Sequence, residues 1–166
     1  MEKLKRRFVK EKEAKRLVLE FQKKMRINLQ RMPALRAPIE LAKVNNIEIF
    51  LISKKPLFAR IHNELYPTLV TTQLLFDLPK ATVNMGAVPY VCNGADVMAP
   101  GLTGFEGDFK KGDMVIVRDE RYQKPIAITL ALYNAEEAGK LQHGRVLKNV
   151  HYVGDKVWKA IMQLSK

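Results

Sequence analysis

The chain has 166 residues, of which 47% are hydrophobic and 28% are charged, and its formal net charge is +12. This length suits one ordinary domain or two small ones, and the composition is normal for a globular protein with a real core. A single cysteine excludes an internal disulfide, and no apolar run is long enough to span a bilayer or to act as a signal sequence, so we expect a cytoplasmic protein.

The basic excess is concentrated near the N-terminus. Residues 1–40 carry 13 Lys and Arg against 5 Asp and Glu, whereas residues 81–153 carry 8 of each. A basic surface attracts phosphate backbones, and less often anionic lipid, through its long-range field and through counterion release. The charge therefore favours an RNA partner over a role in solubility alone.

In the first half, apolar spacing predicts one long helix. The helix is predicted over residues 3–30. Ala14, Val18, Phe21 and Met25 recur at intervals of three or four residues, and Leu4 and Phe8 continue this apolar stripe toward the N-terminus. Pro33 and Pro38 interrupt this pattern, so a second helix, over 39–44, is expected to be short.

Strands are predicted next, over 47–52 and 57–61, around a turn at 54–56. Pro67 suits the first turn of a helix that runs to residue 75, and residues 77–80 are typical of a linker. The net charge and the pattern of residue types both change near residue 80, which is the predicted domain boundary.

The second half is rich in short β-type runs separated by Gly, Pro and Asp. Strands are predicted over 114–117, 126–132, 144–147 and 150–153, with a small helical turn over 135–138. Short strands at this spacing are typical of a small barrel or sandwich.

The segment from Met85 to Gly101 is the most informative stretch. A glycine, a short apolar strand, and then Asn-Gly-Ala-Asp and Ala-Pro-Gly predict a strand–turn–helix–turn unit whose glycines let backbone amides approach a ligand. This segment resembles the start of a PUA domain, a small RNA-binding module, and Lys111–Val115, Pro125–Ile128 and Gly144–Val146 resemble its later strands. The resemblance implies a pseudo-barrel that binds structured RNA and performs no chemistry.

A wider resemblance covers almost the entire chain. The matching blocks are Leu65–Leu69, Asn84–Ala87, Gly94–Thr103 and Asn149–Tyr152, with Trp158 near the end. They are similar to the malignant T-cell-amplified sequence family, and the basic composition and compact length would suit an archaeal member. Eukaryotic members bind the small ribosomal subunit and act in translation re-initiation and recycling with a density-regulated partner protein.

This resemblance implies an α+β fold: a small basic α/β domain over 1–79, a PUA pseudo-barrel of short mixed strands over 80–158, and a tail over 159–166. We expect a non-catalytic protein that is monomeric when free, without cofactor or metal. It would bind structured RNA, namely small-subunit rRNA or the acceptor end of a tRNA, and would not bind a membrane. The open alternatives are an accessory subunit of an RNA-modifying enzyme and a free-standing enzyme.

The candidate RNA-binding residues form four groups. The resemblance places the loop residues Gly94, Ala95, Asp96, Ala99, Pro100 and Gly101 at the end of an RNA stem. The predicted last strand adds Arg145, Lys148, Asn149 and His151, and a basic loop adds Arg118, Tyr122 and Lys124, which suit phosphate contacts and base stacking. The N-terminal segment adds Arg6, Arg7 and Lys10. Each group also has a competing interpretation without RNA. In the order given, these are turn glycines, a solvated strand edge, an ordinary surface loop and a solvated helix face.

Catalysis has little support in the sequence. His62, His143 and His151 are isolated and lack metal-ligand spacing. Glycines near residue 101 are spaced like a phosphate-binding loop, but no Gly-Lys-Ser/Thr follows them. Cys92 lies in an apolar run and is expected to be a buried thiol.

Overall fold

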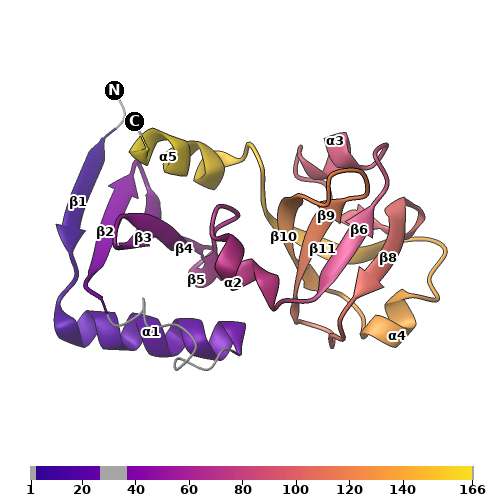
Figure 1. Ribbon diagram of the computed structural model, residues 1–166, viewed down its shortest axis with the longest axis horizontal. Coiled ribbons are helices and arrows are strands. Elements are labelled where there is room, and N and C mark those ends of the chain that lie inside the picture. The colour runs from indigo at the N-terminus through magenta and orange to yellow at the C-terminus, as the bar shows by residue number, and fades with distance from the viewer. Residues whose placement is uncertain (1–2, 27–36, 166) are drawn as a thin grey trace. The chain divides into compact units, whose positions relative to one another are not determined.

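The computed structural model describes residues 3–26 and 37–165. The chain divides into two compact units, Met1–Thr71 with Lys159–Lys166, and Thr72–Trp158 (Figure 1). The sequence predicted a boundary at 79/80 and a separate tail over 159–166. By contacts, the division falls eight residues earlier, between Thr71 and Thr72, and the last residues group with the first unit.

The first unit contains a five-stranded sheet with the order β1-β2-β3-β4-β5, in which every neighbouring pair is antiparallel. Its elements are β1 (Leu4–Phe8), α1 (Glu11–Met25), β2 (Ile39–Val44), β3 (Ile47–Ile52), β4 (Lys55–Ile61) and β5 (Glu64–Pro67). Because short turns connect β2 to β5 in sequence, neighbouring strands pair locally.

Helix α1 packs on one face of this sheet through stacked aromatic rings. The ring of Phe21 lies 4.6 Å from that of Phe58, which in turn lies 5.1 Å from that of Phe50. All three are at most 2% exposed. Leu17 and Met25 are also buried and share the helix face with Phe21, since residues three and four apart stack along a helix.

Three predictions for the first unit are wrong. Residues 4–8 form β1 and not the start of the helix, which begins at Glu11. Residues 39–44 form the strand β2 and not a short helix. Pro67 ends β5, and the helix that follows, α2 (Thr72–Phe76), begins five residues later. The predicted strands over 47–52 and 57–61 are confirmed as β3 and most of β4.

The second unit contains a six-stranded mixed sheet with the order β7-β11-β10-β9-β6-β8, in which β6 and β9 are parallel. The sheet curls into a PUA pseudo-barrel, as the sequence predicted, around a core that includes Val83, Val117 and Leu147. Besides α2, its elements are β6 (Lys80–Val83), α3 (Val88–Val91), β7 (Val97–Met98), a 3₁₀ turn (Ala99–Gly101), β8 (Leu102–Glu106), β9 (Met114–Asp119), β10 (Pro125–Ala131), α4 (Ala135–Ala138), β11 (Arg145–Tyr152) and α5 (Lys156–Leu164). Helix α5 continues into residues that group with the first unit.

Within the second unit, the order of elements in the glycine-rich segment differs from the prediction. The apolar run that was expected as a strand is α3, with Pro89 in its first turn, and the residues after Gly94 form β7 instead of a helix. The two closing strands expected over 144–147 and 150–153 are one strand, β11. The strands at β9 and β10 and the helical turn at α4 are confirmed. None of the described helices is long and apolar enough to cross a membrane.

Candidate nucleic-acid interface

Three side chains tie the loop before β7 to β11. The carboxylate of Asp96 accepts the backbone N–H of Asn149 at 2.9 Å and lies 3.3 Å from Nη1 of Arg145. The amide of Asn149 donates to the carbonyls of Val91 and Ala95, each at 3.0 Å, while its Oδ1 is buried without a partner among the described residues. The loop is therefore braced from both sides, which lowers the ordering cost when a ligand binds.

Two glycines, one in this loop and one in the 3₁₀ turn after β7, occupy positions where a Cβ would make a very tight contact. Gly94 has a φ of +96°, and a Cβ on it would lie 3.2 Å from the ring of Tyr152. A Cβ on Gly101 would lie 3.1 Å from Cβ of Ala87, although its φ is not positive. The backbone of Asn84 donates to the carbonyl of Gly101 at 2.9 Å. Packing thus explains both glycines. Residues 93–95 are exposed, and their N–H groups donate to the backbone carbonyls of Tyr90 and Val91.

A buried carboxylate organises the turn between β9 and β10. Asp119 is 4% exposed and accepts the backbone N–H groups of Tyr122 and Lys124, at 2.5 and 3.2 Å. Burial opposes ionisation of this carboxyl, but the N–H donors outweigh that effect and hold its pKa below the ordinary value. Glu120 accepts the N–H of Met85 at 3.1 Å, so the turn is also joined to the loop before α3. Tyr122, which is 64% exposed, is presented at the tip.

The predicted residues of the second unit differ in how accessible they are. Gly94, Ala95, Pro100, Tyr122, Lys124, Arg145 and Lys148 are exposed, and Asp96, Gly101, Arg118 and Asn149 are partly buried. Arg118 is held by Glu106 at 2.8 Å and by Thr82 at 3.1 Å, so its charge is already compensated. The structure brings Asp96, Arg145 and Asn149 together with the loop.

Two of the residues predicted to contact RNA have buried side chains. Ala99 is 8% exposed and belongs to the hydrophobic core of the second unit. His151 is fully buried, and its Nδ1 lies 2.7 Å from Oδ2 of Asp155, so it cannot stack on a base. Asp155 also accepts the N–H of Trp158 at the start of α5. Burial opposes the charge on Asp155, but these partners outweigh it and lower its pKa.

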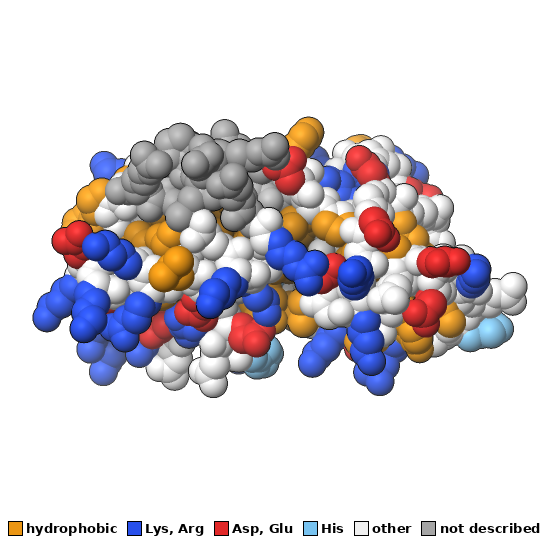
Figure 2. All heavy atoms as spheres, turned by 90° about the horizontal axis from the view of Figure 1, so that it is seen from below, with side chains coloured by type: hydrophobic (Ala, Val, Ile, Leu, Met, Phe, Trp, Pro, Cys, Tyr) orange, Lys and Arg blue, Asp and Glu red, His pale blue; other side chains and the backbone are white. Residues whose placement is uncertain are grey.

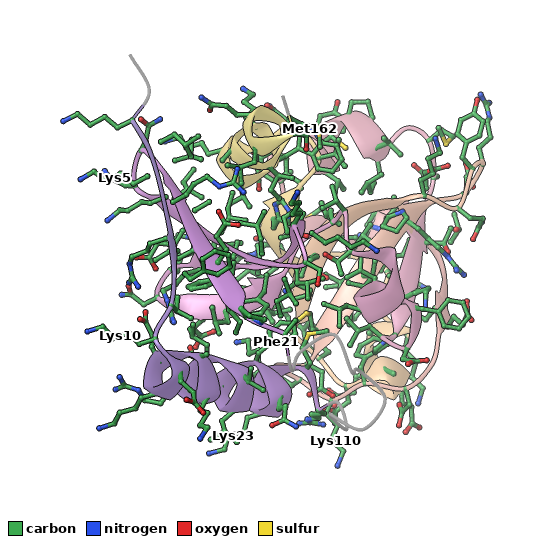
Figure 3. All side chains as sticks on the ribbon, turned by 60° about the vertical axis from the view of Figure 1, so that its left-hand side comes forward. Lys5, Lys10, Phe21, Lys23, Lys110 and Met162 are labelled. Atoms are coloured by element: carbon green, nitrogen blue, oxygen red, sulfur yellow. The ribbon has the colours of Figure 1, made fainter. Side chains whose placement is uncertain are left out.

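In the first unit, two of the three predicted cations are occupied by ion pairs. Nε of Arg6 lies 2.5 Å from Glu40, and Nη1 of Arg7 lies 3.3 Å from Glu13. Lys10 is exposed and forms no ion pair with a described residue, and it extends away from the unit in Figure 3.

A second group of cations lies on the outer face of α1. Lys12, Arg16 and Lys23 are exposed and share one stripe of the helix with Leu19, because their spacings of four and seven residues bring them onto the same face. Figure 2 shows Lys and Arg side chains gathered over the unit that carries α1. This stripe is opposite the face that packs on the sheet, so it is free to meet a polyanion.

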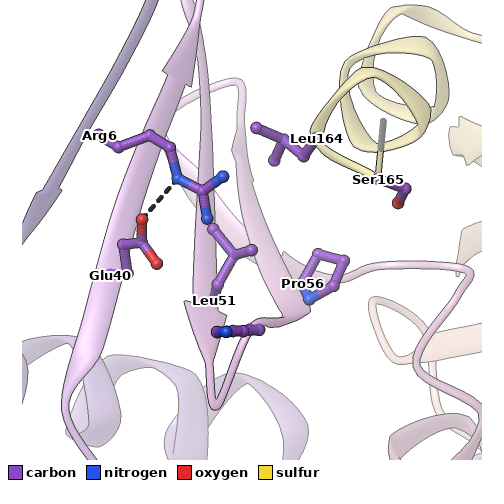
Figure 4. Close-up of a pocket in the computed structure, with 7 residues that line it drawn as sticks. Arg6, Glu40, Leu51, Pro56, Leu164 and Ser165 are labelled. Atoms are coloured by element: carbon purple, nitrogen blue, oxygen red, sulfur yellow. Dashed lines mark hydrogen bonds and ion pairs between the residues drawn. The ribbon is translucent and has the colours of Figure 1, made fainter.

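A small pocket of about 450 Å³ also lies in the first unit (Figure 4). The side chains that line it come from β1, β2, β3, the β3–β4 turn, β4 and the C-terminal end of α5: Arg6, Glu40, Leu51, Lys54, Pro56, Leu164 and Ser165. Arg6 and Glu40 neutralise each other on its wall, and Lys54 leaves the lining with a net positive charge.

The sequence interpretation missed the residues that brace the site. Asn84, whose Oδ1 accepts the N–H of Ala87 at 2.9 Å, and Asp119 were not singled out. The signal for Asp119 was present, because an Asp at the first position of a short polar segment before Lys-Pro is typical of an Asx turn. Among residues 3–26 and 37–165, no group of three His, Cys, Asp or Glu could hold a metal ion. Burial raises the pKa of the partly buried Cys92 thiol.

With this geometry described, comparison with known proteins defines the class. Residues 79–153 match the PUA domain family, and residues 5–73 match a domain of unknown function, DUF1947. A solved PUA-domain structure from Aeropyrum pernix K1, a tartrate complex, superimposes with a TM-score of 0.84 at 25% identity and covers 99% of this chain and 95% of that one. The fold is thus that of a two-unit PUA-domain protein.

Sequence relatives identify the family. An uncharacterized protein of Methanocaldococcus jannaschii is 35% identical over 95% of this chain and 98% of its own length. Malignant T-cell-amplified sequence 1 of Danio rerio is 30% identical over 73% of this chain and 70% of its own length. Translation machinery-associated protein 20 of Saccharomyces cerevisiae is 29% identical over 74% and 72%. The chain belongs to the malignant T-cell-amplified sequence family.

Proposed function

We propose that this chain is a non-catalytic RNA-binding protein of the translation machinery, acting in the cytoplasm during initiation, re-initiation or recycling. The second unit holds an RNA end, the acceptor end of a tRNA, and the first unit docks on the small ribosomal subunit. The protein is monomeric when free and works with a partner of the density-regulated type. The names of the yeast and fish relatives and the PUA match support this proposal.

The braced loop before β7 is the observation that carries the proposal for the second unit. Its exposed backbone at Gly94 and Ala95 is fixed by Asp96 and Asn149, and the exposed Arg145 and Lys148 lie on the strand to which it is tied. The N–H groups of Gly94 and Ala95 already donate to the carbonyls of Val91 and Tyr90. The cations of Arg145 and Lys148 beside this ordered loop are therefore the donors that would contact phosphates. Site preorganisation of this kind serves a binding protein without any catalytic group.

For the first unit, the outer stripe of α1 supports docking on ribosomal RNA. Lys12, Arg16 and Lys23 are exposed cations on one face, and none forms an ion pair with a described residue. Contacts of this kind give affinity through counterion release and little sequence preference. Docking on a large folded RNA needs no more than that.

Co-sedimentation with purified small ribosomal subunits across a salt series tests the proposal. We expect saturable binding near one protein per subunit, lost steeply as salt rises. The charge reversal Lys23→Glu should weaken this binding and lower the slope of log affinity against log salt by about one or more. Lys140→Glu, an exposed cation of α4's end that pairs with Glu136, is the matched control.

Binding to free tRNA separates the two units. Lys148→Glu should weaken tRNA binding, and Lys23→Glu should leave it nearly unchanged. Retained tRNA affinity with no binding to subunits at any salt concentration would contradict the ribosomal role and favour an accessory subunit of an RNA-modifying enzyme. If Lys148→Glu kept both its tRNA binding and its subunit binding, β11 would not be part of the site.

A further inference from the structure

Strand β1 lies at one edge of the five-stranded sheet of the first unit. It pairs with β2 on one side, and no described strand pairs with its other side (Figure 1). All five of its side chains are exposed. An open strand edge offers a row of backbone donors and acceptors that another extended chain can use.

The hydrogen bonds at the two ends of the β1–β2 pair show which backbone groups face β2. The N–H of Asn45 donates to the carbonyl of Lys3 at 3.0 Å, and the N–H of Val9 donates to the carbonyl of Ile39 at 2.9 Å. The register between these ends is continuous, without a bulge. In an antiparallel pair, hydrogen-bonded and non-hydrogen-bonded positions alternate, so the odd-numbered residues of β1 face β2.

The even-numbered residues Leu4, Arg6 and Phe8 therefore direct their backbone N–H and C=O groups outward. Lys5 and Arg7 direct theirs toward β2. The free edge thus presents three donors and three acceptors at the two-residue spacing of a strand. This spacing matches a peptide backbone, whereas a phosphate chain has no donors to match the carbonyls.

The side chains on this edge are unusual for an unprotected strand. Leu4 is 45% exposed and Phe8 is 68% exposed, and both lie on the same face, on either side of Arg6. Lys5, Arg6 and Arg7 supply the charge that usually protects an edge strand, but the two exposed apolar side chains at the ends of β1 do not protect it. These side chains would be buried against apolar residues of an added strand.

The charges on β1 indicate which kind of strand would fit. Arg6 and Arg7 each have one carboxylate partner, and Lys5, which points away from the sheet in Figure 3, has no ion-pair partner among the described residues. A second copy of β1 would place like charges opposite one another, which destabilises pairing. A strand with acidic residues opposite these cations would be favoured.

We propose that β1 accepts an extended segment of a partner protein as a sixth strand, with apolar residues opposite Leu4 and Phe8 and acidic residues opposite the three cations between them. This interaction is β-augmentation, in which main-chain hydrogen bonds give affinity and alternate side chains give specificity. It uses no residue of the second unit and does not depend on RNA binding.

The test uses the full-length chain and a capped synthetic peptide, Ile-Glu-Glu-Glu-Val, titrated by calorimetry. We expect saturable binding with one peptide per chain. N-methylation of the central Glu removes the N–H that faces the carbonyl of Arg6, and it should weaken binding at least about ten-fold. N-methylation of a neighbouring Glu, whose N–H faces away from β1 in an antiparallel pairing, should change affinity by about two-fold or less.

Matched protein variants locate the site. Phe8→Ser should weaken peptide binding, whereas Leu19→Ser, which removes an exposed apolar side chain from α1, should not. Equal losses from both N-methylated peptides or from both variants would overturn the proposal, because binding would then not depend on the outward-facing carbonyl of Arg6 or on the side chain of Phe8. Absence of saturable binding would also overturn the proposal. So would full displacement of the peptide by a short RNA duplex, if Phe8→Ser left the affinity for the peptide unchanged.

Discussion

Gly94 has a backbone conformation that L-residues rarely adopt, and the ring of Tyr152 fills the space where its Cβ would lie. A side chain here costs energy twice, through the positive φ and through displacement of the ring. We predict that Gly94→Ala lowers the free energy of unfolding by about 1–2 kcal/mol. Urea denaturation followed by near-UV circular dichroism would measure this loss.

Gly104 supplies the control for that substitution. No atom lies within 4 Å of its Cβ position, and its φ is not positive. Gly104→Ala should leave stability unchanged within about 0.5 kcal/mol. If Gly94→Ala proved equally harmless, neither the positive φ nor the ring of Tyr152 would constrain the loop before β7.

Burial is the residue-level property that the sequence predicted least well. Ala99 was assigned to the RNA surface by the family resemblance, and His151 was assigned to it by its place on the predicted last strand. Both are buried: Ala99 belongs to the hydrophobic core of the second unit, and the ring of His151 lies against Asp155 just before α5. Tyr122 and Lys148 were predicted to be accessible, and they are exposed. The exposure of Tyr122 at a turn and of Lys148 on a strand follows from local sequence and does not depend on contacts with residues far away in the chain.

Among the elements, the turn between β9 and β10 depends on one carboxylate. Each oxygen of Asp119 accepts a separate backbone N–H. In Asp119→Asn, the amide nitrogen faces one of those donors, so we predict a loss of about 1–3 kcal/mol in the free energy of unfolding at neutral pH. The exposed Asp108, replaced by Asn, is the matched control and should show no loss.

The loss in Asp119→Asn should depend on pH in a defined direction. The pKa of Asp119 is lowered in the folded chain, below its ordinary value of 3.8. The carboxylate therefore contributes its full stability above about pH 4, and this contribution is lost as pH falls through the folded-state pKa. The difference between the wild-type chain and Asp119→Asn should shrink in that acid range. A difference that stayed constant down to pH 2 would contradict the assigned role of the carboxylate.

The type of element was predicted wrongly where the same apolar residues fit both the helix period and the strand period. Leu4 and Phe8 are four residues apart, which places them on one face of a helix and equally on one face of a strand. The run over β2 has no clear alternation, because four of its six residues are buried and both faces of the strand are covered. The apolar run of α3 was predicted as a strand. Pro89 lies in its first turn, where proline is compatible with a helix.

For the whole molecule, the two-part architecture and the pseudo-barrel could be predicted, because they follow from composition, turn residues and family motifs that span many positions. The predicted boundary at 79/80 lies beside the start of the PUA match at residue 79, whereas the division by contacts falls at Thr71. The last residues were set apart as a tail, yet they group with the first unit, and Ala160 and Ile161 are buried. Contacts that join residues far apart in sequence leave no local pattern in the residues that make them.

A chain that ends at Trp158 tests the part played by these last residues. Because Ala160 and Ile161 are buried and group with the first unit, we predict that the shortened chain loses stability there, with faster amide hydrogen exchange in β2 and β3. Exchange in β9 and β10 should change little. Equal loosening of both units would contradict the division at Thr71.

The discontinuity of the first unit also determines the order in which the molecule can be made. During synthesis, residues up to 71 emerge early, but the segment from Lys159 onward emerges only after the entire second unit. Since domains form as units while the chain is being produced, the second unit can be complete while the first still awaits its final helical turns. The first unit, which carries both the cationic stripe of α1 and the open edge of β1, would therefore mature after the second unit.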